Sequence, residues 1–250
     1  MKQNIYDDKE FFKKYDELRI EKRGLNANDL IEIPAFRNIM PDVTGKKILD
    51  LGCGYGENDK YYKELGAKSI LGLDISTHMI EIANKYNKLS DIDYRVMAMK
   101  DISQINDKFD IVISSLAFHY IKDYNKLLKD IYNLLNKDGY LIFSQEHPFK
   151  TCIKYTENVK KGHIIIDNKY FGLFSDYNRP GMRTKEWLDK TVIKYHRTFT
   201  EIINELVKNS FYVERIEEPV ATQDALNKNP KYINQLDRPF FLIVKAKKVV

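Results

Sequence analysis

Three glycines follow a short apolar run at alternate positions, an arrangement that leaves the main chain bare. Gly52, Gly54 and Gly56 permit positive φ, so a ligand can lie directly on the backbone, and the amides there favour an anionic or hydroxyl-bearing group. A dinucleotide fingerprint requires glycine at position 57, where Glu57 stands and would oppose a pyrophosphate. Because no Gly-Lys-Ser/Thr follows, a phosphate-binding loop is excluded as well, and the pattern disfavours NAD and FAD.

An acid stands at the end of the next apolar run. Asp74 follows Asp50 by 24 positions and can accept hydrogen bonds from the two vicinal hydroxyls of a ribose, each strengthened by the carboxylate charge. The ligand is therefore expected to contain an unphosphorylated ribose. We expect Asp50 to point into the glycine loop and to hold an ammonium group or the loop amides. The alternative is that the two acids only cap strand ends and helix starts.

Short apolar runs alternate with helical patterns through the middle of the chain. The strand candidates are Lys47 to Leu51, Ser69 to Asp74, Ile92 to Met97, Phe109 to Ser114 and Tyr140 to Gln145. The helix candidates between them are Asp59 to Leu65, Ser76 to Asn87, with Ser76 as its cap, and Tyr124 to Leu135. Asn136 to Gly139 is expected to stop the last helix with a glycine turn. This alternation predicts an α/β fold with a mostly parallel sheet covered on both faces.

The regular alternation of strand and helix patterns ends on either side of this core. Residues 1–44 are expected to form a helical cap, 45–146 the ligand-binding core, 147–197 an insertion over the sheet, and 198–250 a helix and two strands, all within one domain. That last helix is expected over Thr198 to Asn209. The two strands, Tyr212 to Glu217 and Phe240 to Ala246, are expected to complete the sheet as an antiparallel pair.

Composition limits the class of protein further. The 250 residues are 43% hydrophobic and 31% charged, which suits one large domain and excludes a disordered chain. Only two cysteines occur, Cys53 and Cys152, so a disulfide scaffold or a four-thiolate zinc site is excluded, and no ligand spacing predicts a metal. No apolar run reaches the roughly 18 residues of a membrane span, and no signal peptide is evident. We therefore expect a soluble cytoplasmic protein.

Taken together, these motifs resemble those of class I S-adenosylmethionine-dependent methyltransferases. Leu49 to Gly56 with Asp74 resembles their nucleoside-binding half, Phe109 to Tyr120 their fourth strand and its loop, and Leu135 to Ser144 the approach to the fifth strand. The likeness covers about residues 45–146. It implies a Rossmann-like, doubly wound, mostly parallel sheet of seven strands, with S-adenosylmethionine as the cofactor over the carboxyl ends of the first, second and fourth strands.

The resemblance also suggests which residues touch the cofactor. The glycines would contact its methionine and ribose portions, Asp74 the ribose and Ile75 the adenine. This chain has Met97-Ala-Met-Lys-Asp101 where many relatives have Gly-Asp-Ala, so adenine recognition is expected from the Met99 backbone or from Asp101. With Arg19 for the cofactor carboxylate, the expected cofactor contacts are Tyr15, Arg19, Asp50, Gly52, Cys53, Gly54, Gly56, Asp74, Ile75, Met99 and Ser115.

Methyl transfer would need an enclosed site and, for some acceptors, a proton acceptor. Aromatic rings suit a sulfonium, and the candidates for such a lid are Tyr6, Tyr15, Tyr170, Phe174, Tyr177 and Trp187. His119, His147 and His196 are the candidate bases, since imidazole accepts a proton near neutral pH, and Glu146 is expected to orient His147 or a substrate amine. Ordinary packing for the rings and structural hydrogen bonds for the histidines remain possible. An amine or an acidic phenol needs no base.

Patches outside the core resemble a bacterial subgroup of small-molecule methyltransferases. They are Tyr15 to Arg19, Asn28 with Pro34, Glu146 to Pro148, Tyr195 to Thr198, Glu218-Pro219 and Arg238 to Leu242. Methylation of an unidentified small molecule is thus the first hypothesis. The net charge of +5 leaves tRNA methylation open, although a nucleic-acid partner is disfavoured. Two further hypotheses are a non-catalytic module that binds S-adenosylmethionine, and an oxidoreductase. Nothing in the sequence indicates an oligomeric state.

Overall fold

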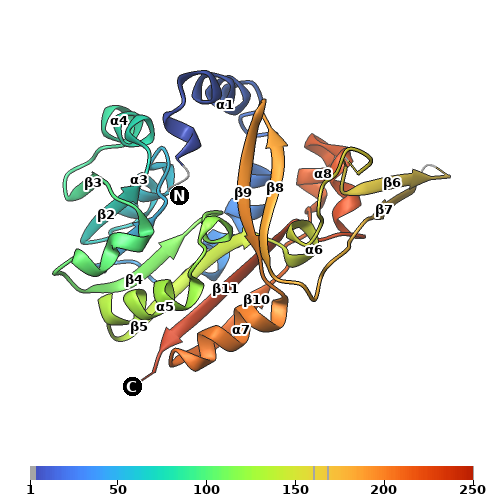
Figure 1. The fold of residues 1–250 in the computed structure, drawn as a ribbon. Coiled ribbons are helices and arrows are strands. Elements are labelled where there is room, and N and C mark those ends of the chain that lie inside the picture. The colour runs from blue at the N-terminus through green and yellow to red at the C-terminus, as the bar shows by residue number, and fades with distance from the viewer. Residues whose placement is uncertain (1–3, 160, 168, 250) are drawn as a thin grey trace.

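Seven strands form one sheet in the order β10-β11-β5-β4-β1-β2-β3 (Figure 1). The structure is a computed structural model that describes residues 4–159, 161–167 and 169–249. The strands of this sheet are β1 (Lys47–Leu51), β2 (Ser69–Asp74), β3 (Ile92–Val96), β4 (Phe109–Ser114), β5 (Leu135–Glu146), β10 (Phe211–Glu217) and β11 (Phe241–Lys248). Strands β1 to β5 run parallel, and β11 pairs antiparallel with both β5 and β10. The predicted α/β fold with an antiparallel pair at its edge is confirmed.

Helices cover both faces of this sheet. They are α1 (Lys9–Glu21), α2 (Ile33–Ile39), α3 (Glu57–Glu64), α4 (Thr77–Tyr86), α5 (Tyr124–Leu134), α6 (Pro148–Thr151), α7 (Phe199–Lys208) and α8 (Gln223–Lys228). Segments with other helical geometry are η1 (Ile5–Asp7), η2 (Asn28–Glu32), η3 (Met99–Gln104), η4 (Phe118–Tyr120) and η5 (Pro230–Gln235). Ser76 Oγ accepts the Met79 N–H at 3.3 Å, which confirms the predicted cap of α4.

The core consists of two apolar layers because successive side chains of a strand point to opposite faces. Leu49 and Leu51 of β1 pack with residues of α5 and α7, whereas Ile48 packs with residues of α2, α3 and α4. All three β1 side chains are inaccessible to solvent. The uninterrupted apolar strands predicted from the sequence are therefore explained by burial on both faces.

The predicted glycine stop after α5 is wrong in its detail. Strand β5 begins at Leu135, directly after the helix, and Asp138 carries the left-handed conformation with φ of 60°. Gly139 does not have positive φ. Instead, a Cβ there would lie 3.0 Å from the carbonyl oxygens of Asn136 and Asp110, so glycine is needed for close packing rather than for the turn.

The segment after β5 contains strands that its sequence did not predict. A hairpin of β6 (His163–Ile166) and β7 (Lys169–Gly172) projects from one end of the molecule, and a second of β8 (Gly181–Trp187) and β9 (Lys190–His196) rises to meet α1 (Figure 1). Neither hairpin joins the main sheet. Among the described residues, no helix has both the length and the apolar character needed to cross a membrane.

Candidate functional site

The glycine loop between β1 and α3 has the bare surface expected of it. Gly52, Gly54 and Gly56 have φ of 81°, 55° and 74°, a region that glycine enters without strain. A Cβ on Gly52 would lie 2.8 Å from Cβ of Ala117 and 3.0 Å from Cε of Met99. At Gly54, by contrast, no described atom outside its chain neighbours lies within 4 Å of a Cβ position. The main chain at Gly54 is therefore open to a ligand.

Gly56 is required for a different reason. It caps α3, and any side chain there would collide with the ring of Tyr94. The Tyr94 hydroxyl donates to the carbonyl oxygen of Gly56 at 3.3 Å. This glycine thus permits packing of β3 against the loop, and its expected contact with the cofactor stays a prediction.

Asp74 at the end of β2 is tied directly to this loop. Its Oδ2 accepts the N–H of Gly54 at 3.1 Å, and its Oδ1 accepts the N–H of Ser76 at 2.8 Å. Each carboxylate oxygen keeps a further lone pair for a ligand hydroxyl. Burial raises the pKa of Asp74, and the two amides oppose that shift. The acid is therefore held in a fixed orientation beside the open main chain of Gly54.

The expectation that Asp50 holds the loop amides is wrong. The N–H groups of Gly52 and Cys53 donate to the carbonyl oxygen of Leu73, at 2.7 and 2.9 Å. Asp50 is 3% exposed and interacts with the carboxyl of Asp59, which is fully buried. Burial raises the pKa of Asp50 well above its usual range and that of Asp59 to about 7, so the pair retains a proton near neutral pH.

Cys53 and Ile75 lie beside the loop as expected but make mainly structural contacts. Burial and the nearby carboxyls of Asp59 and Asp50 raise the pKa of the Cys53 thiol well above its usual value, so it is not a reactive thiolate. The carbonyl oxygen of Ile75 accepts a hydrogen bond from Nδ2 of Asn4 at 3.1 Å. The N-terminal segment therefore reaches the loop where adenine is expected.

Ser115 points to a buried acid that sequence reasoning missed. Its Oγ donates to Glu32 at 2.9 Å, and Ser144 Oγ donates to the same carboxyl oxygen. Glu32 is fully buried at the end of η2, and this burial raises its pKa to about 7. A glutamate between Ile31 and Ile33 was the signal for an inward-facing acid. The expected contact of Ser115 with the cofactor stays a prediction.

Aromatic rings from the N-terminus and the β8–β9 hairpin form one cluster. Tyr6 contacts Tyr15 and Phe11 with ring centroids 5.1 and 5.4 Å apart, and Trp187 contacts Phe11 and Tyr15 at 5.4 and 5.9 Å. Tyr6 is buried, and this burial together with the nearby Tyr120 raises its pKa well above the usual value. Burial raises the pKa of Tyr15 to about 12, so its hydroxyl stays protonated. Three of the predicted lid residues, Tyr6, Tyr15 and Trp187, are thus brought together.

The other three predicted lid residues lie elsewhere in the insertion. Phe174 and Tyr177 pack on Phe149 at 5.7 and 5.5 Å, and Tyr170 packs on His163 at 5.1 Å. Phe174 is 66% exposed. Of the described residues of the insertion, those of its second hairpin alone join the aromatic cluster around Tyr15.

Arg19, the residue expected to bind the cofactor carboxylate, already forms an ion pair within the protein. Its guanidinium pairs with Glu57 at 2.5 Å and lies over the ring of Tyr55, 5.7 Å from the centroid. The Tyr55 hydroxyl donates to Asp16 at 2.8 Å. These contacts join α1 to the start of α3, so Arg19 would have to share or leave Glu57 to meet the cofactor.

His147 has both ring nitrogens engaged within the protein. Its Nδ1 accepts the N–H of Phe149 at 3.1 Å, and its Nε2 lies 2.6 Å from Oε1 of Glu218. Accepting at Nδ1 places the ring proton on Nε2, so Glu218 is the acceptor. The ring is 2% exposed, and burial lowers its pKa. Glu218, rather than the expected Glu146, orients this histidine.

The other two candidate bases are buried too. His196 contacts Thr151 Oγ1 through Nδ1 at 2.9 Å and the carbonyl oxygen of Tyr177 through Nε2 at 2.8 Å, and burial lowers its pKa. His119 accepts the Glu146 N–H at Nδ1, 3.4 Å away, and burial lowers its pKa to about 3. All three histidines are thus neutral at pH 7. Their role as proton acceptors stays a prediction.

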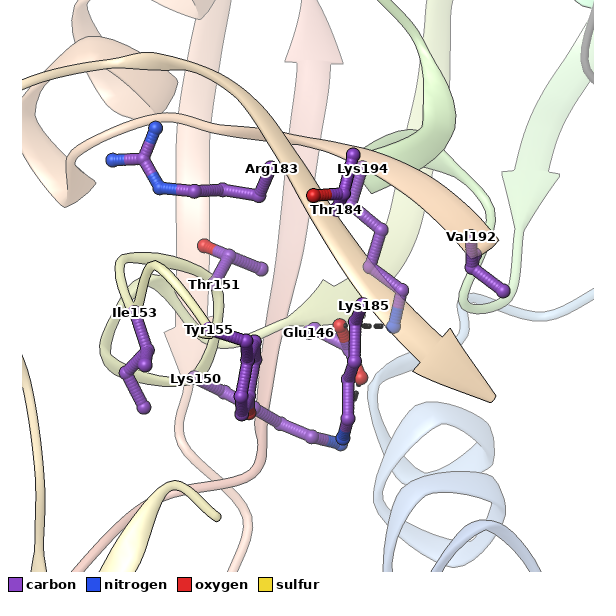
Figure 2. A pocket seen from close by; sticks show the side chains of 10 residues that line it. All are labelled: Glu146, Lys150, Thr151, Ile153, Tyr155, Arg183, Thr184, Lys185, Val192 and Lys194. Carbon is purple, nitrogen blue, oxygen red and sulfur yellow. Dashed lines mark hydrogen bonds and ion pairs between the residues drawn. The ribbon is translucent and has the colours of Figure 1, made fainter. Parts of the chain in front are cut away.

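Glu146 at the end of β5 faces a pocket under the β8–β9 hairpin (Figure 2). Its carboxylate pairs with Lys150 of α6 at 2.8 Å and with Lys194 of β9 at 2.7 Å. Although burial opposes ionisation, these lysines hold the pKa of Glu146 well below its usual range.

Within the described part of the chain, histidines, cysteines and acids nowhere gather in a group of three or more that could hold a metal ion.

A seven-stranded doubly wound sheet with an open glycine loop after β1 and an oriented acid after β2 defines a nucleoside-binding α/β protein. Comparison with known proteins specifies the class. The model of the methyltransferase domain family matches residues 49–143, which run from β1 into β5.

Relatives match the chain over most of its length. A solved S-adenosylmethionine-dependent methyltransferase from Mesorhizobium loti is 32% identical, with a TM-score of 0.81 over 89% of this chain and 98% of its own. A candidate enzyme of the same class from Listeria monocytogenes is 34% identical, with a TM-score of 0.77 over 88% and 97%. An uncharacterized protein of Haemophilus influenzae is 35% identical over 98% of this chain and 97% of its own. The chain belongs to the S-adenosylmethionine-dependent methyltransferases, and S-adenosylmethionine is its cofactor.

Proposed function

We propose that this protein transfers a methyl group from S-adenosylmethionine to a small molecule. The observation that carries the proposal is the cover at the glycine loop: Tyr15 of α1 contacts Tyr55 of the loop, and the β8–β9 hairpin reaches α1 (Figure 1). Lys14 pairs with Asp189 at 2.6 Å, and Lys190 pairs with Asp8 at 2.9 Å. An enclosed site of this kind suits an acceptor that can be surrounded, and it would have to open widely for a folded macromolecule.

The residues present fit the cofactor. We expect the main chain at Gly54 to support its methionine portion and Asp74 to accept hydrogen bonds from its ribose. When bound, S-adenosylmethionine supplies an electrophilic methyl group on a positively charged sulfur. The rings of Tyr6 and Tyr15 would face that charge, each worth about 0.5–2 kcal/mol. Fixing the acceptor beside the methyl group and excluding water would then provide most of the catalysis.

The state of the histidines favours an acceptor that needs no strong base. His119 is a weak base because burial lowers its pKa to about 3. The Nδ1 lone pair of His147 already accepts the Phe149 N–H, and His196 is engaged by Thr151. A neutral amine or an acidic hydroxyl would react without any of them. We therefore propose an amine or a phenol-like oxygen as the methylated group.

The test is release of S-adenosylhomocysteine from S-adenosylmethionine. The protein is incubated with the dialysable fraction of a cell extract, with unfractionated tRNA, and with the non-dialysable protein fraction. The proposal expects product with the dialysable fraction. Product with tRNA alone would indicate a tRNA methyltransferase, and product with the protein fraction alone would indicate a protein substrate. Tight cofactor binding with no product from any of the three fractions would indicate a non-catalytic protein that binds S-adenosylmethionine.

A further inference from the structure

The pocket under the β8–β9 hairpin carries more positive than negative charge. Besides Arg183, the charged side chains that line it come from four elements: Glu146 from β5, Lys150 from α6, Lys185 from β8 and Lys194 from β9 (Figure 2). The side chains of Glu146 and Lys194 are 13% and 16% exposed. Glu146 and Lys150 are separated from Lys185 and Lys194 by 35 or more positions in the sequence. Only the fold brings the two pairs together.

One carboxylate and three ammonium groups meet in this cluster, so one ammonium group is left without an ion pair. Glu146 pairs with Lys150 and Lys194, whereas the ammonium group of Lys185 has neither an ion pair nor a hydrogen bond within the described ranges. Its Nζ lies over the ring of Tyr155, 5.1 Å from the centroid. Burial lowers the pKa of Lys185, although Glu146 opposes the shift. A half-buried cation without a counterion is costly, and a bound anion would remove that cost.

Arg183 lines the same pocket but has a structural role. Its guanidinium donates to the carbonyl oxygens of Cys152 at 3.0 Å and Arg179 at 2.7 Å, with further contacts to Asp176 and Met182. These bonds fix the loop before β8 to the end of α6. The ammonium group of Lys185 therefore remains as the cation offered to a ligand.

The cluster adjoins the expected site of methyl transfer. The backbone N–H of Glu146 donates to His119, next to Tyr120, and the Lys194 ammonium lies 5.8 Å from the centroid of the Tyr120 ring. Tyr120 in turn lies close enough to Tyr6 of the aromatic cluster for the two hydroxyls to affect each other's pKa. An acceptor held by these lysines would thus approach the aromatic cluster from the side of β5 and β9.

We propose that this pocket binds an anionic group, a carboxylate or a phosphate, on the small-molecule acceptor, with Lys185 as the main contact. The inference rests on the proposed function and specifies its substrate class. Because Glu146 already neutralises much of the positive charge of Lys150 and Lys194, the anion would form its main ion pair with Lys185. The enclosed position of the pocket favours a small anion over the backbone of a nucleic acid, which binds exposed basic surfaces.

Binding of simple anions tests the site directly. The protein, saturated with S-adenosylhomocysteine, is titrated with inorganic phosphate and with succinate in a calorimeter at low ionic strength. The variants are Lys185→Gln, Lys185→Arg and, as the matched control, Lys129→Gln on the exposed face of α5. We expect the wild type, the arginine variant and the control to bind at least one anion, and Lys185→Gln to bind it about tenfold more weakly, as loss of one charge-assisted hydrogen bond implies.

Three results would overturn the inference. They are no anion binding by the wild type, equal binding by Lys185→Gln and Lys129→Gln, or a loss of S-adenosylhomocysteine affinity in Lys185→Gln. The last result would assign the pocket to the carboxylate of the cofactor. If the second result is accompanied by a loss of tRNA affinity in Lys185→Gln, measured by filter binding, the pocket is assigned to nucleic acid instead.

A second arm separates this inference from the proposed function. Aromatic amines and phenols bearing a carboxylate or a phosphate are compared with their neutral amides as acceptors. We expect kcat/KM to favour the anionic members in the wild type and the preference to shrink in Lys185→Gln. If the wild type methylates the neutral members equally well, the anion site is wrong while the small-molecule function stands. If it methylates none of them but methylates tRNA, both are wrong.

Discussion

The backbone N–H of Gly54 donates to Oδ2 of Asp74 across 3.1 Å, and this bond joins the loops that follow β1 and β2. The open main chain and the expected ribose acceptor therefore form one rigid unit. Ser76 supports the same carboxylate from the other side, at 2.8 Å. Because both oxygens are fixed before a ligand arrives, little conformational entropy remains to be lost on binding.

Replacement of Asp74 by alanine should weaken cofactor binding without unfolding the protein. Hydrogen bonds to a charged group contribute about 1.5–3 kcal/mol, which corresponds to a Kd for S-adenosylhomocysteine roughly 10- to 150-fold higher. Calorimetry measures the affinity, and circular dichroism checks the fold. The control is Asp93→Ala in the exposed part of β3. Equal affinity of the two variants would remove Asp74 from the ribose site.

Replacement of Trp187 by alanine should loosen the cover over the site. The ring packs edge-on against Phe11 and Tyr15, and such pairs contribute about 0.5–1.5 kcal/mol each. Local opening of α1 should therefore become more frequent, and hydrogen exchange of residues 9–21 should accelerate. The comparison is Trp187→Phe, which keeps an aromatic ring, with β4 as the internal reference. Unchanged exchange in α1 would show that the hairpin does not hold this helix.

Replacement of Glu32 by glutamine should make stability less dependent on pH. Burial raises the folded-state pKa of Glu32 to about 7, against 4.5 as its ordinary value. The folded state therefore keeps a proton that the unfolded state releases, so this acid stabilises the fold fully below pH 4.5 and loses that contribution as pH rises to about 7. Between pH 5 and pH 8 the contribution of Glu32 to the free energy of unfolding should fall by about 2–3 kcal/mol.

Urea unfolding at pH 5 and at pH 8 provides the measurement. The wild type should lose more unfolding free energy over this interval than Glu32→Gln does. Asp50 and Asp59 act in the same direction because burial raises their pKa values as well, so the variant should keep part of the dependence. Glu10→Gln, at an exposed position of α1, serves as the control. Parallel losses in the wild type and Glu32→Gln would mean that Glu32 is ionised in the folded protein.

The central sheet and the cofactor loop were predictable because their signals are local. Ile48 and Val112 belong to strands buried on both faces, which leaves an uninterrupted apolar run in the sequence. The glycines from 52 to 56 and Asp74 are fixed by the backbone geometry of one βαβ unit. Short-range pattern and spacing are therefore enough to place them.

The remaining features depend on contacts between distant parts of the chain. Ile164 to Ile166 are all exposed, so the β6–β7 hairpin has no alternation of buried and exposed side chains to reveal it. Asp59 lies in a polar-looking helix, and only the approach of α3 to Gly72 of β2 makes it an interior acid. Glu218 is 71 positions from His147, so its role in orienting that histidine required the antiparallel edge of the sheet to be in place.

His147 offers a test that separates a structural role from catalysis. Its Nδ1 caps α6 by accepting the Phe149 N–H, a function that asparagine performs well through its side-chain oxygen. Asparagine does not accept a proton near neutral pH. We therefore expect His147→Asn to retain turnover and His147→Ala to lose about 1 kcal/mol of stability, as is typical for a lost cap.

Turnover is measured as S-adenosylhomocysteine release across pH 6 to 9 at saturating acceptor, and stability by urea unfolding. Glu218→Gln is the matched variant, because it keeps an acceptor for the Nε2–H while removing the charge. If His147 takes the acceptor's proton, both His147 variants lose turnover although cofactor affinity is kept, and the pH profile loses its acidic limb. Retained turnover in His147→Asn, with the pH profile unchanged, assigns His147 to positioning α6 beneath the β8–β9 hairpin.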